Sequence, residues 1–451
     1  MRKIFVAGHR RADGKYVKPH WRTVPGAEQQ APTMPAFAPT AYAKEDGERP
    51  LHLAPIPLTN SAQAVVGSLQ AIGTPYVVGG SVRDSVLGLG EPKDVDIEVH
   101  GDVSMAHMAS HLRSDGFAVD EVGKAFGVLK VVCGGEDFDV SLPRRDSLPA
   151  NSGGRHTDIV ATTDGTMGVA EASRRRDFTI NAVMFDPATG EFVDPHGGLD
   201  DMRYGVLRAV DEASFAEDPL RVLRGVQFAG RLNMELDSAT ERLCRSLSAD
   251  GLAKERIAGE LHKLVTKSTN FARGVNTLHS VGWGHIAPSL TGNGTVNQQV
   301  LTRLASHPDP NVAMGTATAY ISACYGEATA GTARDLMLSK AERRHAHWFT
   351  ATPANQAEYS RMLRSAYSAQ VDYDTVDQAI AAAGGTPHKR LWEGKPPNYL
   401  VDGNWLRELG YQPGKEFKNI ITWAHAQQDA GVELTQADVM RYADNLYAGG
   451  S

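Results

Sequence analysis

The sequence is poor in the residues that build disulfide frameworks and structural zinc sites. Its 451 residues include only three cysteines, Cys133, Cys244 and Cys324, which stand far apart with no Cys-x-x-Cys pair. This spacing argues against a disulfide scaffold or a structural zinc cluster and suggests a reducing compartment, so we expect a cytoplasmic protein. The chain also lacks any run of about 18 consecutive apolar residues, so we expect no membrane span and no membrane partner.

The chain has no overall excess of basic residues. It carries 46 Lys and Arg against 53 Asp and Glu, a formal net charge of −7. Basic residues do gather at the start, where residues 1–22 hold seven Lys or Arg and one Asp. We predict a flexible basic arm there that touches RNA phosphates, with a solvated tail, a folded cap or a targeting peptide as alternatives. Residues 23–60 are rich in Pro and Ala without apolar periodicity, which predicts a disordered linker.

Predicted strands and helices alternate from about residue 61, and after about residue 200 nearly every segment is predicted helical. This pattern predicts an α+β protein in which a small α/β head is followed by a long all-α region. The predicted parts are a head at 61–200, a helical neck at 201–270, a helical body at 271–382 and a helical tail at 383–451.

A Gly-Gly-Ser turn followed by two aspartates forms the first candidate site. A predicted strand ends at Gly79 and Gly80, and Ser81 is predicted to cap the helix that follows. Two glycines let backbone N–H groups approach a phosphate closely, and the helix N-terminus adds its positive dipole. Asp94 and Asp96 stand two residues apart at the next predicted strand, so their carboxylates share one face and suit Mg²⁺. The alternative is a tight turn and a solvated pair of acids at a strand edge.

A third carboxylate lies on a neighbouring predicted strand. In the string EDFDVSLPRR, Asp139 stands between apolar residues. A charge flanked in this way either faces the core with a partner or serves as a ligand of a site. We expect Asp139 to be the third carboxylate on the metal side.

The strings GGSVRDSVLG, DVDIEV and DVSLPRR together resemble the class II tRNA nucleotidyltransferases, which comprise the CCA-adding enzymes and the bacterial poly(A) polymerases. The resemblance covers roughly residues 61–290 strongly and 330–447 loosely. It implies a polymerase-beta-type nucleotidyltransferase head followed by an all-α neck, body and tail. It also implies that Asp94, Asp96 and Asp139 are catalytic and that Asp94 and Asp96 hold the metal. The expected nucleotide-binding residues of these first motifs are Gly79, Gly80, Ser81, Arg83 and Arg144.

The string RRRDFTINAVMFD at 174–186 is the most specific in the chain. Arg175 and Arg176 supply forked donors suited to phosphate oxygens. Asp177 and Asn181 are four residues apart, so in a helix they would share a face and could hold a ribose or order the arginines. The alternative is a surface basic cluster with Asp177 as a helix cap. Because RRDFTINA matches the second motif of the resembled family, these residues are expected to cradle the triphosphate and sugar of the nucleotide.

A third motif, EDPLRVLRGVQFAGRL at 217–232, places Asp218 and Arg221 on one helix face, with Arg224 continuing the stripe. A structural explanation is available, because Asp218 before Pro219 is typical of a helix cap and the arginines could face solvent. In the resembled family this motif reads the incoming base. The resemblance therefore implies that Asp218 and Arg221 select CTP or ATP and that Arg224 also binds the nucleotide.

The resemblance implies a template-independent enzyme that adds CCA to tRNA 3′ ends from CTP and ATP by a two-metal, Mg²⁺-dependent transfer. The helical regions would bind the acceptor and T arms of tRNA by shape and phosphates. Ala125 follows Lys124, where the poly(A) polymerases tend to have two consecutive basic residues. The alternatives are a bacterial-type poly(A) polymerase, an enzyme adding only CC or only A, and a non-catalytic RNA-binding relative.

Overall fold

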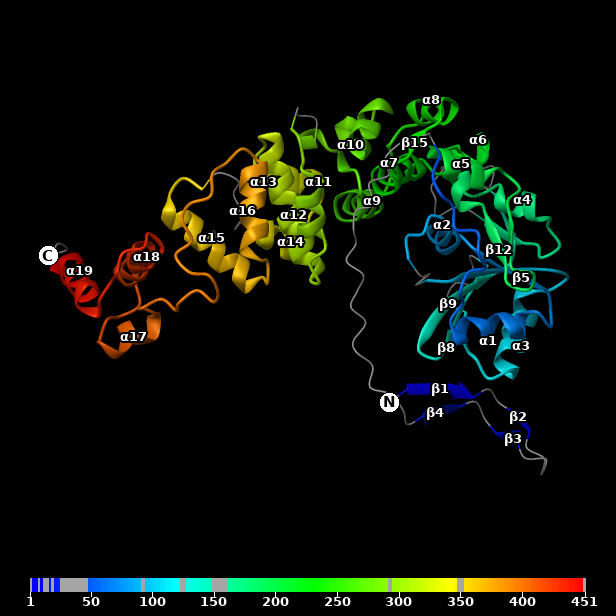
Figure 1. Ribbon diagram of the computed structural model, residues 1–451, viewed down its shortest axis with the longest axis horizontal. Coiled ribbons are helices and arrows are strands. Elements are labelled where there is room, and N and C mark those ends of the chain that lie inside the picture. The colour runs from blue at the N-terminus through cyan, green and yellow to red at the C-terminus, as the bar shows by residue number, and fades with distance from the viewer. Residues whose placement is uncertain are drawn as a thin grey trace. The chain divides into compact units, whose positions relative to one another are not determined.

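The computed structural model describes residues 2–6, 9–10, 16–17, 20–24, 48–90, 94–121, 127–147, 160–290, 294–346 and 353–448 (Figure 1). The chain divides into two compact units, of which the first comprises Met1–Gly225 and Met234–Leu252. The second comprises Val226–Asn233 and Ala253–Ser451. Within the described ranges, no helix is both long and apolar enough to cross a membrane.

A seven-stranded mixed sheet with the strand order β13-β12-β5-β6-β9-β8-β7 forms the centre of the first unit. Neighbouring strands are antiparallel except for β6 and β9, which run parallel. The strands are β5 (Thr74–Val78), β6 (Asp96–His100), β7 (Ala118–Asp120), β8 (Val128–Cys133), β9 (Glu136–Ser141), β12 (Met184–Asp186) and β13 (Glu191–Val193). The four longer strands were predicted, whereas β7, β12 and β13 were not, because three residues are too few to show an alternation.

The alternation of side chains along β6 gives the strand one apolar and one polar side. Ile97 and Val99 are fully buried on one side, and Asp96, Glu98 and His100 lie on the other. The helices α1 (Asn60–Leu69) and α3 (Met105–Ser114) pack against each other, and α1 also packs against β5 and β8. The polar side of β6 is where the candidate acids lie.

Short helices and two-stranded pairs complete the first unit. The helices are α2 (Gly80–Val86), α4 (Val169–Ser173), η3 (Thr179–Asn181), α5 (Gly198–Tyr204), α6 (Glu212–Ala216) and α8 (Ser238–Ser246). The pairs are β10 (Arg144–Ser147) with β11 (Val160–Thr163), and β14 (Val206–Leu207) with β15 (Glu235–Leu236). The β14–β15 pair and the bridge between Phe178 and Ala209 hold the chain beyond residue 200 in the first unit. This unit therefore extends past the predicted head boundary at 200.

The basic segment at residues 1–22 contains strands. β1 (Arg2–Val6) pairs antiparallel with β4 (His20–Val24), and β2 (His9–Arg10) pairs with β3 (Tyr16–Val17). We predicted a flexible arm for this segment. The paired strands differ from that prediction and correspond to its alternative, a folded cap.

The described part of the predicted linker, residues 48–59, lies along the head. The backbone N–H groups of Arg49 and His52 donate to the carbonyls of Arg203 and Val86 at 2.7 and 2.8 Å, and Ile56 is buried. Backbone hydrogen bonds and an apolar anchor thus order this segment, where we predicted disorder. The rest of the predicted linker, residues 25–47, lies outside the described residues.

The second unit is helical, as predicted. The long helix α7 (Leu220–Leu232) begins in the first unit and ends in the second. The elements that follow are α9 (Lys254–Lys267), α10 (Phe271–Ser280), η4 (Gly284–Ile286), η5 (Pro288–Leu290), α11 (Gln298–Ala305), α12 (Pro310–Tyr325), α13 (Thr329–Asp335), α14 (Lys340–Ala346), α15 (Gln356–Ser368), α16 (Tyr373–Ala382), α17 (Gly403–Glu408), α18 (Lys415–Asp429) and α19 (Gln436–Ala448).

Many of these helices begin at an Asp or Asn whose side chain accepts from backbone N–H groups of the first turn, which is the expected use of these residues. The capping residues are Asn270, Asn297, Asp309, Asn355, Asp372 and Asp402. The last three helices share a small core of Val401, Leu406, Phe417, Ile420, Ala424, Val439 and Ala443.

Candidate active site

Two of the candidate carboxylates lie side by side on the sheet. Asp96, the first residue of β6, pairs with Asp139 of the parallel strand β9, and paired residues of neighbouring strands point to the same face. Asp94 precedes β6 and is exposed. Asp139 also lies 3.6 Å from the ammonium of Lys130 on β8. The predicted proximity of Asp139 to Asp96 is therefore observed, and Asp139 has a cation of its own.

The electrostatics of Asp96 fit a cation-binding role. Burial of the carboxyl, together with the charges of Asp139 and Asp94, raises the pKa of Asp96 to about 6, although Arg176 and Lys130 act in the opposite direction. A divalent cation beside Asp94 and Asp96 would offset this repulsion. In the described part of the chain, no group of three or more His, Cys, Asp or Glu side chains is arranged to hold a metal ion. Two carboxylates would therefore need phosphate oxygens as further ligands, which is a common arrangement for Mg²⁺.

The turn after β5 borders both an acid and a guanidinium. Gly79 has a φ of 80°, which favours glycine. A Cβ atom at this position would stand 3.4 Å from Oδ2 of Asp96 and 3.7 Å from Nη1 of Arg176. The bare backbone of Gly79 thus leaves room between a candidate metal ligand and a candidate phosphate ligand.

The residues that follow Gly79 differ in part from the prediction. The cap of α2 is Gly79, and Ser81 lies inside the helix, where its hydroxyl donates to the carbonyl of Val78 at 3.2 Å. The prediction of Ser81 as the helix cap is therefore wrong, because the cap, Gly79, lies two residues earlier. Gly80 opens the helix, and a Cβ there would approach only the guanidinium of Arg83.

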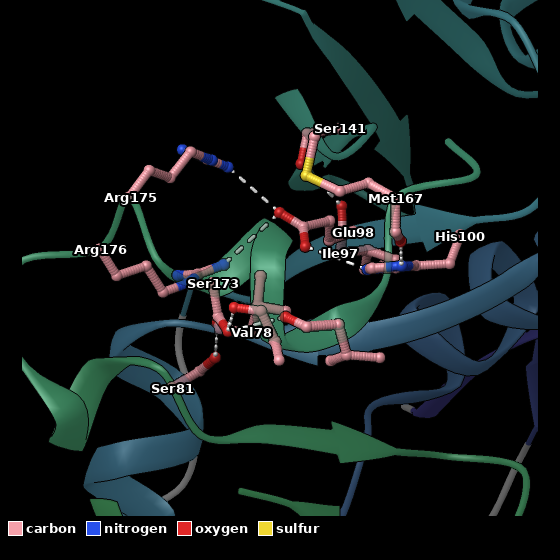
Figure 2. Close-up of polar contacts among 12 residues, drawn as sticks. Val78, Ser81, Ile97, Glu98, His100, Ser141, Met167, Ser173, Arg175 and Arg176 are labelled. Carbon is pink, nitrogen blue, oxygen red and sulfur yellow. Dashed lines mark hydrogen bonds and ion pairs between the residues drawn. The ribbon is translucent and has the colours of Figure 1, made fainter. Parts of the chain in front are cut away.

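Arg175 and Arg176 follow α4 and point to Glu98 on β6 (Figure 2). Nη2 of Arg175 lies 3.1 Å from Oε2 of Glu98, and Nη2 of Arg176 lies 3.7 Å from the same oxygen. Burial lowers the pKa of Arg176, and the charge of Glu98 is the largest effect opposing this shift. The alternative of a surface basic cluster does not fit this geometry, because the two arginines are partly buried and held by a buried acid. Their predicted role in binding phosphate stays a prediction.

Asp177, Asn181, Arg83 and Arg224 form a single hydrogen-bonded network. Nδ2 of Asn181 donates to Asp177 at 2.8 Å, and Arg83 donates to Oδ1 of Asn181 at 2.7 Å. Nε of Arg224 donates to Asp177 at 2.6 Å. Asp177 and Asn181 are close, but they do not share a helix face as predicted, because only residues 179–181 form a single 3-10 turn. Arg83, Asp177 and Asn181 are buried, so the network fixes the loop that carries the arginines.

The start of α7 shows contacts that compete with base recognition. The carboxylate of Asp218 accepts from the backbone N–H of Leu220 at 3.3 Å, as a helix cap does. The guanidinium of Arg221 donates to the carbonyls of Ser214 and Arg175, both at 2.5 Å. Burial lowers the pKa of Arg221. Arg221 therefore links α7 to the loop that carries Arg175 and Arg176.

Arg144 is placed apart from the seven-stranded sheet. It opens β10 and pairs with Thr163 of β11, in a separate two-stranded sheet. A Cβ on Gly127 would lie 3.9 Å from its Cδ atom. The predicted role of Arg144 in nucleotide binding stays a prediction.

Sequence reasoning missed Glu98 and His100. Glu98 is fully buried beneath the arginines, and its Oε1 lies 3.1 Å from Nε2 of His100. The signal was present in the alternation of Asp96, Glu98 and His100 along an otherwise apolar strand, which puts three polar side chains on one face.

Comparisons with known proteins agree with this geometry. The family model of the poly A polymerase head domain matches residues 75–208. This range contains every candidate residue described above except Asp218, Arg221 and Arg224 on α7. Residues 75–208 are thus similar to the poly A polymerase head domain, and the predicted resemblance to the class II nucleotidyltransferases is confirmed. At the family level, this head implies dependence on a divalent metal ion.

Two curated relatives carry the name multifunctional CCA protein. The chain is 33% identical to the protein of Xylella fastidiosa (strain M23) over 210 residues, which is 46% of this chain and 47% of that protein. It is 35% identical to the protein of Xanthomonas oryzae pv. oryzae (strain MAFF 311018) over 243 residues, which is 52% of this chain and 54% of that protein. The chain thus spans about half the length of the curated relatives it matches.

Solved structures show the same fold over a longer range. The CCA-adding enzyme of Bacillus stearothermophilus in complex with CTP matches with a TM-score of 0.61 at 24% identity, over 87% of this chain and 99% of that chain. The Thermotoga maritima CCA-adding enzyme complexed with tRNA matches with a TM-score of 0.51 at 18% identity, over 86% and 94%. At these identities the likeness concerns the fold, and it confirms an α+β head followed by helices.

Proposed function

We propose that this protein is a template-independent nucleotidyltransferase that adds CCA to tRNA 3′ ends from CTP and ATP. The observation that carries the proposal is the position of Gly79, whose bare backbone borders both the carboxylate of Asp96 and the guanidinium of Arg176. A nucleoside triphosphate and its metal ion need a carboxylate that binds the metal close to a guanidinium that binds the phosphates. The names of the curated relatives and of the solved structures support the choice of tRNA, CTP and ATP as substrates.

Different residues of the site bind the metal and the triphosphate. Asp94 and Asp96 would hold Mg²⁺, with Asp139 next to Asp96 as the third carboxylate of the site. When bound, the metal ions supply charge stabilisation and lower the pKa of the attacking hydroxyl. The turn from Gly79 to Ser81 and the guanidiniums of Arg175 and Arg176 orient the triphosphate. The 3′-hydroxyl of the RNA then attacks the α-phosphate in line, a new phosphodiester bond forms, and pyrophosphate leaves.

The network around Asp177 has a supporting role in nucleotide binding. Arg83 and Arg224 each bind a different partner in it, Asn181 and Asp177. Both partners are nearly fully buried. We therefore assign Arg83, Arg224, Asp177 and Asn181 to orienting the arginine loop and the sugar.

Base selection is assigned to Asp218 and Arg221. A carboxylate acceptor and a guanidinium donor can pair with the edge of cytosine or adenine, and a mismatched base would leave buried polar groups unpaired. To bind the base, Arg221 would have to give up its hydrogen bond to the carbonyl of Ser214 or of Arg175. Because its Nη2 atom holds the carbonyl of Arg175, this exchange would couple base choice to the arginine that faces the triphosphate.

Poly(A) synthesis is the second candidate function, because the matching family model is that of the poly A polymerase head. The sequence feature that favours CCA addition, Ala125 after Lys124, lies outside the described residues. Enzymes that add only CC or only A share the same head chemistry. The helical second unit is assigned to binding the acceptor and T arms of tRNA, and the cytoplasmic location stays a prediction from the cysteine content.

The deciding experiment incubates the full chain with a tRNA transcript that lacks its 3′ end, together with CTP, ATP and Mg²⁺. Growth by C, C and A, resolved on a sequencing gel, is the expected result. Open-ended addition of A would favour the poly(A) polymerase, and addition of only CC or only A would favour a partial enzyme. Retained tRNA binding without any addition would contradict an enzymatic function. The Asp96→Ala variant is the control for contaminating activity.

A further inference from the structure

We propose that Glu98 positions the phosphate-facing arginines Arg175 and Arg176 against the metal-binding carboxylates, an inference that rests on the proposed function of this site. Glu98 is fully buried, so it does not touch the nucleotide itself. It acts through the arginines and is a positioning residue rather than a catalytic one.

Both oxygens of the Glu98 carboxylate have partners. Oε2 faces Nη2 of Arg175 at 3.1 Å and Nη2 of Arg176 at 3.7 Å. Oε1 lies 3.1 Å from Nε2 of His100, whose Nδ1 in turn lies 3.1 Å from the carbonyl oxygen of Met167. Figure 2 shows Glu98 between the two arginines on one side and His100 on the other. His100 thus fixes the acid, and the acid holds the two guanidiniums.

The strand sets the distance between the two halves of the site. Asp96 and Glu98 are two residues apart on β6 and point to the same side, so their Cα atoms are separated by roughly 7 Å. β6 lies between β5 and β9 in the sheet, and is therefore a rigid support. The arginines, in contrast, come from a loop after α4. Anchoring loop arginines to the strand that carries Asp96 gives the phosphate donors a fixed place beside the metal ligands.

The charge of Glu98 is well stabilised. Two guanidiniums lie within 4 Å of one oxygen of this carboxylate, and the imidazole of His100 lies 3.1 Å from the other. In the described chain, the Nε atoms of Arg175 and Arg176 are buried without a hydrogen-bond partner. Among the described residues, Glu98 is an acid that lies within 4 Å of both guanidiniums. Without its charge, the acids remaining near Arg176 are Asp177 and Asp96. Asp177 is already bound by Asn181 and Arg224, so the guanidinium would turn to Asp96, the carboxylate that should hold the metal.

The test measures CTP binding to the full chain by isothermal titration calorimetry, with Mg²⁺ and without RNA, so that no reaction occurs. Glu98→Gln keeps the size of the side chain and removes its charge. We expect the Kd for CTP to rise roughly tenfold, since a charged hydrogen-bonding group is lost. In an Arg175→Ala/Arg176→Ala background, the same substitution should change the Kd by less than about twofold, because both residues through which it acts are gone. In turnover assays, KM for CTP should rise more than kcat falls.

Asp429→Asn is the matched control. Asp429 is also fully buried and pairs with an arginine, Arg364, at 2.8 Å in the second unit. Its substitution should lower thermal stability but leave the Kd for CTP unchanged. This control separates the loss of a buried ion pair from the loss of arginine positioning.

The remaining outcomes distinguish a wrong positioning role for Glu98 from a wrong proposed function. An unchanged Kd in Glu98→Gln, or effects of Glu98→Gln and of the double variant Arg175→Ala/Arg176→Ala that simply multiply, would overturn the inference while leaving the proposed function intact. A wild-type protein that neither binds CTP nor extends tRNA would instead remove the proposed function. If Glu98→Gln does not fold, Glu98→Asp keeps the charge but withdraws it by one methylene. An increased Kd in that variant supports positioning, and an unchanged Kd makes Glu98 purely structural.

Discussion

The polar side of β6 and the helix α12 both bury polar side chains, but the sequence distance to their hydrogen-bonding partners differs. Glu98 finds its arginine partner 77 residues away in the sequence, and Arg83 finds Asn181 98 residues away. In α12, the hydroxyl of Thr316 donates to the carbonyl of Val312, one helical turn earlier, at 2.8 Å. Buried polar groups in the head therefore specify how distant segments meet, whereas the hydroxyls of Thr316 and Ser322 in α12 bond within their own helix.

This difference predicts where substitutions act. Removing one member of a long-range pair leaves a buried charge or donor without its partner and displaces a functional segment. Removing a hydroxyl that bonds to its own helix leaves the helix ladder intact. The following predictions run from the polar side of β6 to α12, in order of decreasing effect.

Asp96→Ala should reduce nucleotide incorporation by on the order of a thousandfold or more, because it removes a ligand of the metal that stabilises the transition state. Affinity for tRNA, measured by filter binding, should stay near that of the wild type. Asp137→Ala is the matched control, since Asp137 is an exposed acid on β9, two residues from Asp139. Equal losses in both variants would contradict a specific role for Asp96.

Arg221→Ala should lower the discrimination between correct and incorrect nucleotides by roughly 10- to 100-fold, because a buried donor no longer rejects the mismatched base. Mg²⁺ dependence should persist. The measurement compares kcat/KM for CTP, UTP, ATP and GTP on tRNA lacking its 3′ end. Arg245→Ala, which removes an exposed partner of Glu241 on α8, should leave discrimination unchanged. Unaltered selectivity in Arg221→Ala would exclude it from base selection.

Asp96→Asn should stabilise the metal-free protein at pH 7.5 more than at pH 4.5. The pKa of Asp96 is raised to about 6 in the folded state, so its contribution to stability is present below an unfolded-state pKa of about 4 and is lost as the pH rises through 6. Because the side chain of Asp96 remains accessible to solvent even though neighbouring atoms partly desolvate its carboxyl, the difference should be only on the order of 1 kcal/mol. Calorimetric unfolding in EDTA measures it, and added Mg²⁺ should raise the Tm of the wild type but not of the variant. The same Tm difference at both pH values would disprove this electrostatic account.

Thr316→Val should change the free energy of unfolding by less than about 1 kcal/mol, since the lost hydroxyl bonds only within α12. Urea denaturation provides the measurement. A loss of several kcal/mol would show that the Thr316 hydroxyl does more than bond within its own helix, and the contrast with Glu98 would disappear.

Local patterns of the head were predictable from the sequence. The glycine turn before α2, the two aspartates at β6 and the hairpin of β8 and β9 all follow from periods and turn residues within a few positions. The succession of a mixed head and a helical remainder was predictable for the same reason. Asp139 was assigned to the side of Asp96 from its flanking residues, and the parallel register of β6 and β9 places the two side by side.

Features that depend on distant segments were not predictable. Asp177 and Asn181 were expected on one helix, but long-range bonds to Arg224 and Arg83 hold them around a single 3-10 turn. Glu98 was overlooked because its arginine partner Arg175 comes 77 residues later in the chain. The carbonyl partners of Arg221 could not be predicted, because every residue has a backbone carbonyl and the sequence does not distinguish one from another.

The most direct test of the central claim is the anomalous scattering of crystals grown with Mn²⁺ and a non-hydrolysable CTP analogue. The account predicts a manganese peak within coordination distance of both Asp94 and Asp96, with triphosphate oxygens between the metal and Arg176. A nucleotide bound with its metal elsewhere, or acids that face away from it, would contradict the account.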